Sequence, residues 1–393
     1  MSGFPLPEID IPPPWIVTSS SELVEVLSEI KTAPQLAVDV ESDSFYAYQE
    51  RVCLIQISSL EKDYIIDPLA VSDLSSLGEI FSNPAIEKIF HAGEYDVICL
   101  KRDYGFKFQN LFDTMIAARF LSERELGLKA AIARHFGIDL SKKHQRADWG
   151  KRPLNDEQLR YAQLDTRYLI ALSDIQKNLL RERARLADAK ESAENLAQTK
   201  VPQRLFDPEG YRRLKWSRDL SQESRGCLRE LYLMREKIAK ARNKARFRIM
   251  TDELLVKLAA AMPSKHEDFS QIKGMTPYLL QAFGSDVLSA ISRGRQFPEK
   301  APLEKPFSPR IPSGEIALFE KLRAWRKSQA ESEKLDPTAI LSVEQLKDIA
   351  HLSWEKQEDL FRSLSDLKKS RYEKILQEFL ITAHSTPKNQ DPQ

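Results

Sequence analysis

The stretch Leu36-Ala37-Val38-Asp39-Val40, followed by Val52-Cys53-Leu54-Ile55-Gln56-Ile57 and then Tyr64-Ile65-Ile66, decides the fold of the first half of this chain. Each run is short and rich in β-branched or aliphatic residues, which predicts a strand. Short connections separate the three runs, so we expect an antiparallel meander.

Outward from this meander, strand-like and helix-like patterns alternate along the chain. Residues 86–90 and 110–113 predict two more strands, which should add in parallel because helices separate them. The sequence therefore predicts an α/β domain with a mixed sheet and helices on both faces. Helical patterns cover residues 21–31, 73–82, 94–104, 114–122, 126–136 and 155–185.

Beyond about residue 205 the strand patterns end and two all-α segments follow, which match each other at a constant offset of 91 positions. Thr251 and Ser342 are equivalent, and both stand where a helix N-cap belongs. We interpret the segments as copies of one helical module. The equivalent pairs are Leu231 and Leu322, Arg235 and Arg326, Ala239 and Ala330, Ile249 and Ile340, Leu255 and Leu346, and Ala259 and Ala350.

A stretch with five prolines, from Gly294 to Gly314, separates the two modules and predicts an extended linker. The expected organisation is an α/β domain at residues 1–205, a first module at 206–297 and a linker at 298–314. A second module at 315–385 and a tail at 386–393 complete it.

Composition narrows the classes of protein that this chain can belong to. Of 393 residues, 42% are hydrophobic, which excludes general disorder. The net charge of +1 excludes a uniformly basic nucleic-acid binder but not a local basic patch. Three scattered cysteines form no CxxC pair and fit a reducing, cytoplasmic setting. No apolar run is long enough to span a membrane, and no signal peptide is evident.

Two acids lie two positions apart on the first strand, at Asp39 and Glu41. Alternate residues of a strand share one face, so these carboxylates would repel each other if buried. A divalent cation between them would relieve that repulsion. The alternative is that the strand ends near Val40 and water solvates both acids.

Three more residues could complete such a site. Tyr161 and Asp165 lie four apart and would share one face of a helix. Asp96 follows a strand and falls in the first turn of the next helix, where a carboxylate could reach the edge of an open sheet. The alternatives are a surface tyrosine beside a solvated aspartate, and an acid that only stabilises a helix N-terminus.

Together, the order and spacing of these residues resemble the DEDD family of 3′–5′ exonucleases, tyrosine subtype. Phe112-Asp113-Thr114, Leu126-Gly127-Leu128-Lys129 and Asp148-Trp149, followed by Arg152-Pro153-Leu154, resemble the ribonuclease D branch in particular. The two helical modules resemble HRDC domains. Ala147, where many relatives carry serine, and Gly93 depart from the family pattern and leave the acids untouched.

The resemblance implies a ribonuclease H-like sheet and a metal-dependent exoribonuclease that releases nucleotide 5′-monophosphates from RNA 3′ ends, with tRNA precursors as substrates. Asp39, Glu41, Asp96 and Asp165 would hold two divalent cations, Mg²⁺ or Mn²⁺, and Tyr161 would be the catalytic tyrosine. Two cations can serve both ends of an in-line phosphoryl displacement. No organic cofactor is expected, and the oligomeric state stays open.

Residues outside this cluster are candidates for RNA contacts. The first module carries Lys237, Lys240, Arg242, Lys244, Arg246 and Arg248, whereas the equivalent positions of the second carry no positive charge. We expect the first module to bind RNA phosphates through this face, with a solvated helix face as the alternative. His91 could contact a phosphate or be a packed side chain, and the run from Lys142 to Arg146 could touch the substrate.

Other functions remain open at this point. A DNA 3′–5′ exonuclease would need the same acids, and the 2′-hydroxyl contacts that separate RNA from DNA cannot be located from the sequence. A non-catalytic RNA-binding scaffold is the alternative from another class, although all five expected active-site residues are present. A helicase is disfavoured, since the chain has no GxxxxGK[ST] phosphate loop.

Overall fold

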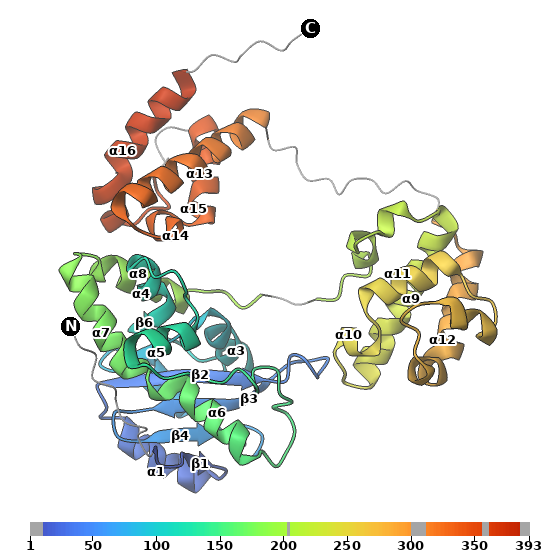
Figure 1. Cartoon of the computed structure of the whole chain (residues 1–393), viewed down its shortest axis with the longest axis horizontal. Coiled ribbons are helices and arrows are strands. Elements are labelled where there is room, and N and C mark those ends of the chain that lie inside the picture. The colour runs from blue at the N-terminus through green and yellow to red at the C-terminus, as the bar shows by residue number, and fades with distance from the viewer. Residues whose placement is uncertain (1–10, 203–204, 300–311, 356–360, 386–393) are drawn as a thin grey trace.

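The computed structural model of the chain describes residues 11–202, 205–299, 312–355 and 361–385. Its first part holds a six-stranded sheet in the order β1-β4-β3-β2-β5-β6 (Figure 1). The strands are β1 (Trp15–Val17), β2 (Gln35–Ser42), β3 (Val52–Ser58), β4 (Asp63–Ile66), β5 (Glu87–Phe90) and β6 (Leu111–Asp113).

Strand directions confirm the mixed sheet that the sequence predicts. β2, β3 and β4 form the antiparallel meander, while β5 adds in parallel to β2 and β6 to β5. The short strand β1, which the pattern did not predict, pairs in parallel with β4. β2 therefore lies in the middle of the sheet, where its side chains are covered on both faces.

Helices cover both faces of this sheet (Figure 1). Val38 and Val40 of β2 pack into the core under α1 and α3, whereas Ala37 packs into the core under α4, α5 and α7. The helices are α1 (Ser20–Ile30), α2 (Leu77–Ser82), α3 (Glu94–Tyr104), α4 (Thr114–Phe120), α5 (Leu128–Phe136), α6 (Asp156–Arg167), α7 (Leu169–Glu182) and α8 (Leu186–Ala197).

Two helical predictions need correction. The single helix expected over residues 155–185 is broken at Tyr168, which ends α6 and precedes α7. The Tyr168 ring is buried against Phe136, with 5.8 Å between ring centroids, so packing sets the break. The helix expected over residues 73–82 begins only at Leu77, and α8 was not predicted.

The two helical modules share one arrangement. The first contains α9 (Gln222–Ala241), α10 (Arg246–Ile249), α11 (Asp252–Ala261) and α12 (Pro277–Gln296). The second contains α13 (Ser313–Glu333), α14 (Pro337–Ile340), α15 (Val343–Glu355) and α16 (Asp366–Ser385). Three of the four helix starts are again 91 positions apart, which places the repeat in the backbone as well as in the sequence.

Individual contacts repeat at the same offset. Arg235 Nη1 donates to the carbonyl oxygen of Met250 at 2.9 Å, and Arg326 Nη1 donates to that of Leu341 at 2.8 Å. The hydroxyl of Thr251 accepts from the backbone N–H of Leu254 at 3.2 Å, and Ser342 caps the equivalent helix. Both predicted N-caps are thus confirmed.

The proline-rich linker is described only at its ends, because residues 300–311 lie outside the described structure. Gly294 was expected to open the extended stretch, but α12 continues through it to Gln296. A Cβ at Gly294 would lie 2.4 Å from the Cα of Cys227, so this glycine lets α12 approach α9 closely. At the other end, Ser313 and Gly314 are already helical.

Both modules dock on the α/β domain through the same corner. Ala245 of the first module donates its backbone N–H to the carbonyl oxygen of Tyr46 at 2.9 Å. Its equivalent in the second module, Asp336, donates to that of Arg119 at 3.3 Å. Figure 1 shows the first module against the β2–β3 connection and the second beside α4 and α8. One repeated corner therefore serves two unrelated docking surfaces.

Candidate active site

The face of β2 that carries Asp39 and Glu41 is set by strand alternation. Since Ala37 packs on the α7 side of the sheet, Asp39 and Glu41 face the same side, toward α6 and α7. One carboxylate oxygen from each of Asp39, Glu41 and Asp165 lies within 4.8 Å of the others. The strand continues to Ser42, so the alternative of two solvated acids beyond the strand end is wrong.

Helix α6 delivers Tyr161 and Asp165 from one face. Its start is set by a capping box, in which the side chain of Asn155 accepts from the N–H of Gln158 at 2.8 Å and Gln158 bonds back at 3.2 Å. The phenol of Tyr161 then hydrogen-bonds to the carboxylate of Asp165. The four-residue spacing read from the sequence therefore places both groups at the β2 acids.

Asp96 reaches the cluster from the first turn of α3. Gly93 makes the sharp turn from β5 into α3, and a Cβ there would lie 2.5 Å from the Cβ of Phe90. The N–H of Gly93 donates to Asp113 Oδ2 at 2.8 Å, while Asp113 Oδ1 caps α4. Asp96 is buried and interacts electrostatically with Asp39 and Asp165, although it is not among the three acids whose oxygens lie closest.

Burial and mutual repulsion raise the pKa of every acid in this cluster. Burial raises the pKa of Asp39 to about 7. Burial, and then the charges of Asp39, Asp165 and Asp96, raise the pKa of Glu41 well above its usual value. Burial and then Asp39 raise the pKa values of Asp96 and Asp165 in the same way. The cluster therefore binds protons more readily than ordinary carboxylates do.

The donor set fits hard divalent cations. It offers carboxylate oxygens and no sulfur, which favours Mg²⁺ or Mn²⁺ over softer metals. Opposite Asp39 in the β2–β3 register lies Gln56, whose side chain is buried. Neither polar atom of its amide has a hydrogen-bond partner among the described residues. A polar group left this way beside a cluster of acids suits a site that takes up ions or water.

Comparison with known proteins agrees with this geometry. Residues 14–181 match the 3′–5′ exonuclease family, and residues 224–291 and 315–381 each match the HRDC domain. The chain belongs to the DEDD 3′–5′ exonucleases. Its α/β part is the exonuclease domain, and its two helical modules are the first and second HRDC domains.

Two curated relatives illustrate the similarity. The exosome complex exonuclease RRP6 of Saccharomyces cerevisiae is 32% identical over 270 residues, covering 65% of this chain and 37% of that protein. Ribonuclease D of Pseudomonas paraeruginosa is 29% identical over 334 residues, covering 83% of this chain and 86% of that protein. The chain spans only about a third of the length of the exosome-component relatives.

Solved structures share the fold. The structure of Escherichia coli RNase D covers 94% of this exonuclease and 99% of that chain, with a TM-score of 0.64 and 24% identity. The catalytic core of RRP6 from Trypanosoma brucei covers 75% and 83%, with a TM-score of 0.66 and 26% identity. Among the described residues, no helix is both long and apolar enough to cross a membrane.

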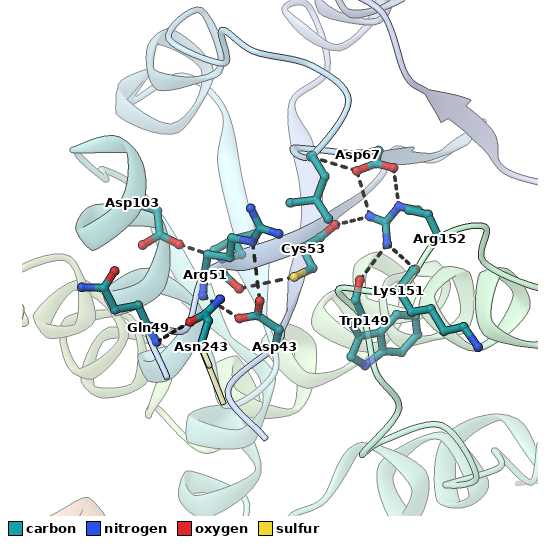
Figure 2. Close-up of polar contacts among 12 residues, drawn as sticks. Asp43, Gln49, Arg51, Cys53, Asp67, Asp103, Trp149, Lys151, Arg152 and Asn243 are labelled. Carbon is teal, nitrogen blue, oxygen red and sulfur yellow. Dashed lines mark hydrogen bonds and ion pairs between the residues drawn. The ribbon is translucent and has the colours of Figure 1, made fainter. Parts of the chain in front are cut away.

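A network around Arg152, which the sequence analysis used only as part of a resemblance, supports the tyrosine of the exonuclease domain (Figure 2). Arg152 bonds both oxygens of Asp67, at 2.6 and 2.8 Å. It also donates to the carbonyl oxygens of Trp149 at 2.7 Å and Cys53 at 2.9 Å. The ring of Trp149 packs 6.0 Å from that of Tyr161, so Arg152 ties the packing partner of the tyrosine to β3.

The predicted RNA contacts of the exonuclease fare unevenly. α9 ends at Ala241, so the six positive charges do not share one helix face, and the exposed Ala241 is not in the core as expected. Arg248 lies 3.7 Å from the ring centre of Tyr46, and Arg242 lies 4.7 Å from that of Phe283. Lys237, Lys240 and Lys244 are exposed, as a phosphate-binding face requires.

His91 is better described as a packed side chain. Its Nδ1 lies 2.8 Å from the hydroxyl of Thr114, and burial lowers its pKa. By contrast, a cavity of about 280 Å³ opens beside Tyr161 and Asp165 of the exonuclease domain. Lys143 and His144, from the run expected to touch the substrate, line it together with Arg160, which the sequence analysis missed.

The raised pKa values of the acids lead to a first prediction. Ionising Asp39 costs free energy in the fold, because its pKa rises from about 3.9 to about 7. That cost is absent below pH 4, grows as the pH rises and is complete above pH 7. We therefore expect Asp39→Asn to raise the Tm of the metal-free protein by at least about 3 °C at pH 8, and by less at pH 5.

Thermal unfolding in a chelator measures this effect, and Mg²⁺ should raise the Tm of the wild type more than that of the variant. Asp139→Asn is the control, because the Asp139 side chain is 81% exposed. A lower Tm for Asp39→Asn than for the wild type at pH 8 would contradict the prediction.

Gly93 supplies a second prediction. Gly93→Ala places a methyl group against Phe90, so the turn must shift, with a loss of about 1–3 kcal/mol in stability. The shift moves Asp96, and we expect nuclease activity to fall by more than tenfold. Gly127→Ala is the matched control, because its added methyl group meets open space. Equal activity of the two variants would show that the turn does not position Asp96.

Proposed function

We propose that this protein is an exoribonuclease that removes nucleotides from RNA 3′ ends and releases nucleotide 5′-monophosphates. The observation that carries the proposal is the meeting of Asp39, Glu41 and Asp165, with Tyr161 bonded to Asp165, inside an exonuclease domain. Ribonuclease D of P. paraeruginosa, similar over 86% of its length, supports RNA as the substrate. tRNA precursors are the substrates that we propose, in the cytoplasm.

Asp39, Glu41, Asp96 and Asp165 are the ligands that we assign to two Mg²⁺ or Mn²⁺ ions. Bound there, the ions would supply a water of lowered pKa and stabilise the leaving oxygen. The raised carboxyl pKa values mean that protons compete with cations for these oxygens, so cation binding should strengthen as the pH rises.

Tyr161 orients water in this proposal and does not act as the full base. Burial, and then the charges of Asp165, Glu41 and Asp39, raise the pKa of its phenol far above the ordinary value of about 10. The phenol therefore keeps its proton, which it donates in a hydrogen bond to Asp165. The lone pairs of its oxygen remain able to accept from a water molecule.

The first HRDC domain holds the RNA in this proposal, through Lys237, Lys240 and Lys244. These lysines are exposed, and the equivalent residues of the second HRDC domain are Ser328, Glu331 and Leu335. Arg242 and Arg248 contribute less, because each guanidinium already lies over an aromatic ring. Local positive charge gives affinity for any RNA sequence, as an exonuclease requires.

Removal of single ligands tests the nuclease assignment. Asp39→Ala and Asp165→Ala should each reduce nucleotide release from a 3′ end to near background while the circular dichroism spectrum keeps its shape. Tyr161→Phe should slow release by roughly 10²–10⁴-fold, the range for groups that assist proton transfer. The assay compares matched RNA and DNA oligonucleotides in Mg²⁺. Normal release by Asp39→Ala would refute the site, and faster digestion of DNA would refute the substrate.

Charge reversal tests the role of the first HRDC domain. The triple change of Lys237, Lys240 and Lys244 to Glu should weaken RNA binding and reduce the salt dependence by about three phosphate contacts. The control reverses Lys327, Lys347 and Lys374, which are exposed lysines of the second HRDC domain. Both variants change the net charge equally, so equal losses of affinity would refute this division of labour.

A further inference from the structure

A hollow on the surface of the first HRDC domain has a lining that none of the residues above explains. It encloses about 360 Å³ between α10, the first turns of α11 and the loop before α12. Arg248, Lys257 and Lys273 line it together with the aromatic ring of Phe247 and one acid, Glu253. Three cations against one carboxylate make it a site for anions, and the ring adds an apolar surface.

The aromatic side of the hollow continues onto the exonuclease domain. The ring centroids of Phe247 and Phe45 are 6.4 Å apart in an edge-to-face arrangement. Both rings remain open to solvent, with Phe247 50% and Phe45 43% exposed. The guanidinium of Arg146 lies 5.7 Å from the ring centre of Phe45, which adds a further cation at this seam.

This seam leads to the candidate active site. Phe45 lies four residues beyond Glu41, so the chain between them can span at most about 14 Å. At the roughly 3.4 Å per nucleotide of a stacked strand, the acids and the Phe45–Phe247 pair are about four to six nucleotides apart. A strand whose 3′ end lies at the acids can therefore pass over both rings.

The second HRDC domain provides an internal comparison, because it has the same fold without these features. The positions equivalent to Phe247, Arg248 and Lys257 hold Thr338, Ala339 and Asp348. Ala339 instead packs into a core of the exonuclease domain. Aromatic rings and cations at this corner are therefore not needed to build the module or to dock it.

We propose that the hollow and the Phe45–Phe247 pair form a binding site for single-stranded RNA, on the 5′ side of the nucleotides held at the acids. Bases stack on the two rings, and phosphates meet Lys257, Lys273 and Arg248. This inference rests on the proposed exoribonuclease function for its direction along the strand. Stacking on aromatic rings is independent of base identity, which suits an enzyme that must accept successive nucleotides.

Equilibrium binding in a chelator tests the site without any need for catalysis. The probe is a fluorescein-labelled 12-nucleotide single-stranded RNA, followed by anisotropy at fixed salt. Phe247→Leu keeps an apolar side chain against Phe45 but removes the stacking surface, so affinity should fall about tenfold. Phe247→Trp should restore it. Wild-type affinity of the leucine variant would overturn the proposal and leave the hollow to a protein partner.

The cations are tested separately. Lys257→Glu with Lys273→Glu should weaken binding of the 12-nucleotide RNA by more than the control pair Lys327→Glu with Lys374→Glu. The two double variants have the same net charge, so equal losses would show a nonspecific charge effect and overturn the site.

Nuclease assays separate this inference from the proposed function. In Mg²⁺, Phe247→Leu should lower the ratio of kcat/KM for the 12-nucleotide RNA to that for a trinucleotide by about tenfold, because the trinucleotide cannot reach the rings. An unchanged ratio would overturn the site. Failure of the wild type to digest either RNA would refute the exoribonuclease function, while the binding result would still decide whether the hollow holds RNA.

Discussion

Electrostatic repulsion among buried carboxylates is the constraint on which the rest of this structure depends. Asp39, Glu41 and Asp165 bring oxygens within 4.8 Å of one another, in a setting that raises every pKa in the cluster. Such an arrangement is unfavourable without a cation or protons, so the scaffold must hold it. It does so with a central strand, a capped helix and a turn that only glycine can make.

Each of these elements is fastened at a distance from the acids. The capping box at Asn155 sets where α6 begins and hence which face carries Tyr161. Asp113 bonds the turn at Gly93 and the start of α4 with its two oxygens. Arg152 ties the segment with Trp149 to β3 and to Asp67, behind the tyrosine. Rigid support of this kind lets an active site keep groups that repel one another.

The HRDC domains show how one fold acquires two roles. Both dock through the corner at Ala245 and Asp336, but the partner surfaces differ. The first domain lies on the β2–β3 connection, next to the strand that carries Asp39 and Glu41, and keeps exposed cations. In the second domain, Glu333 pairs with Arg185 and Arg371 with Asp188, so its charges are used in docking. Duplication followed by loss of charge is enough to explain the difference.

The sequence by itself determined the features with a local period. Alternation placed Asp39 and Glu41 on one face of a strand, a spacing of four placed Tyr161 with Asp165, and a constant offset revealed the duplicated module. Only the tertiary structure decided that Asp96 reaches the acids, that Tyr168 breaks a helix and that Arg248 lies on Tyr46. The reason is physical, because periodicity is encoded in neighbouring residues, whereas these contacts join segments that meet only after the chain has packed.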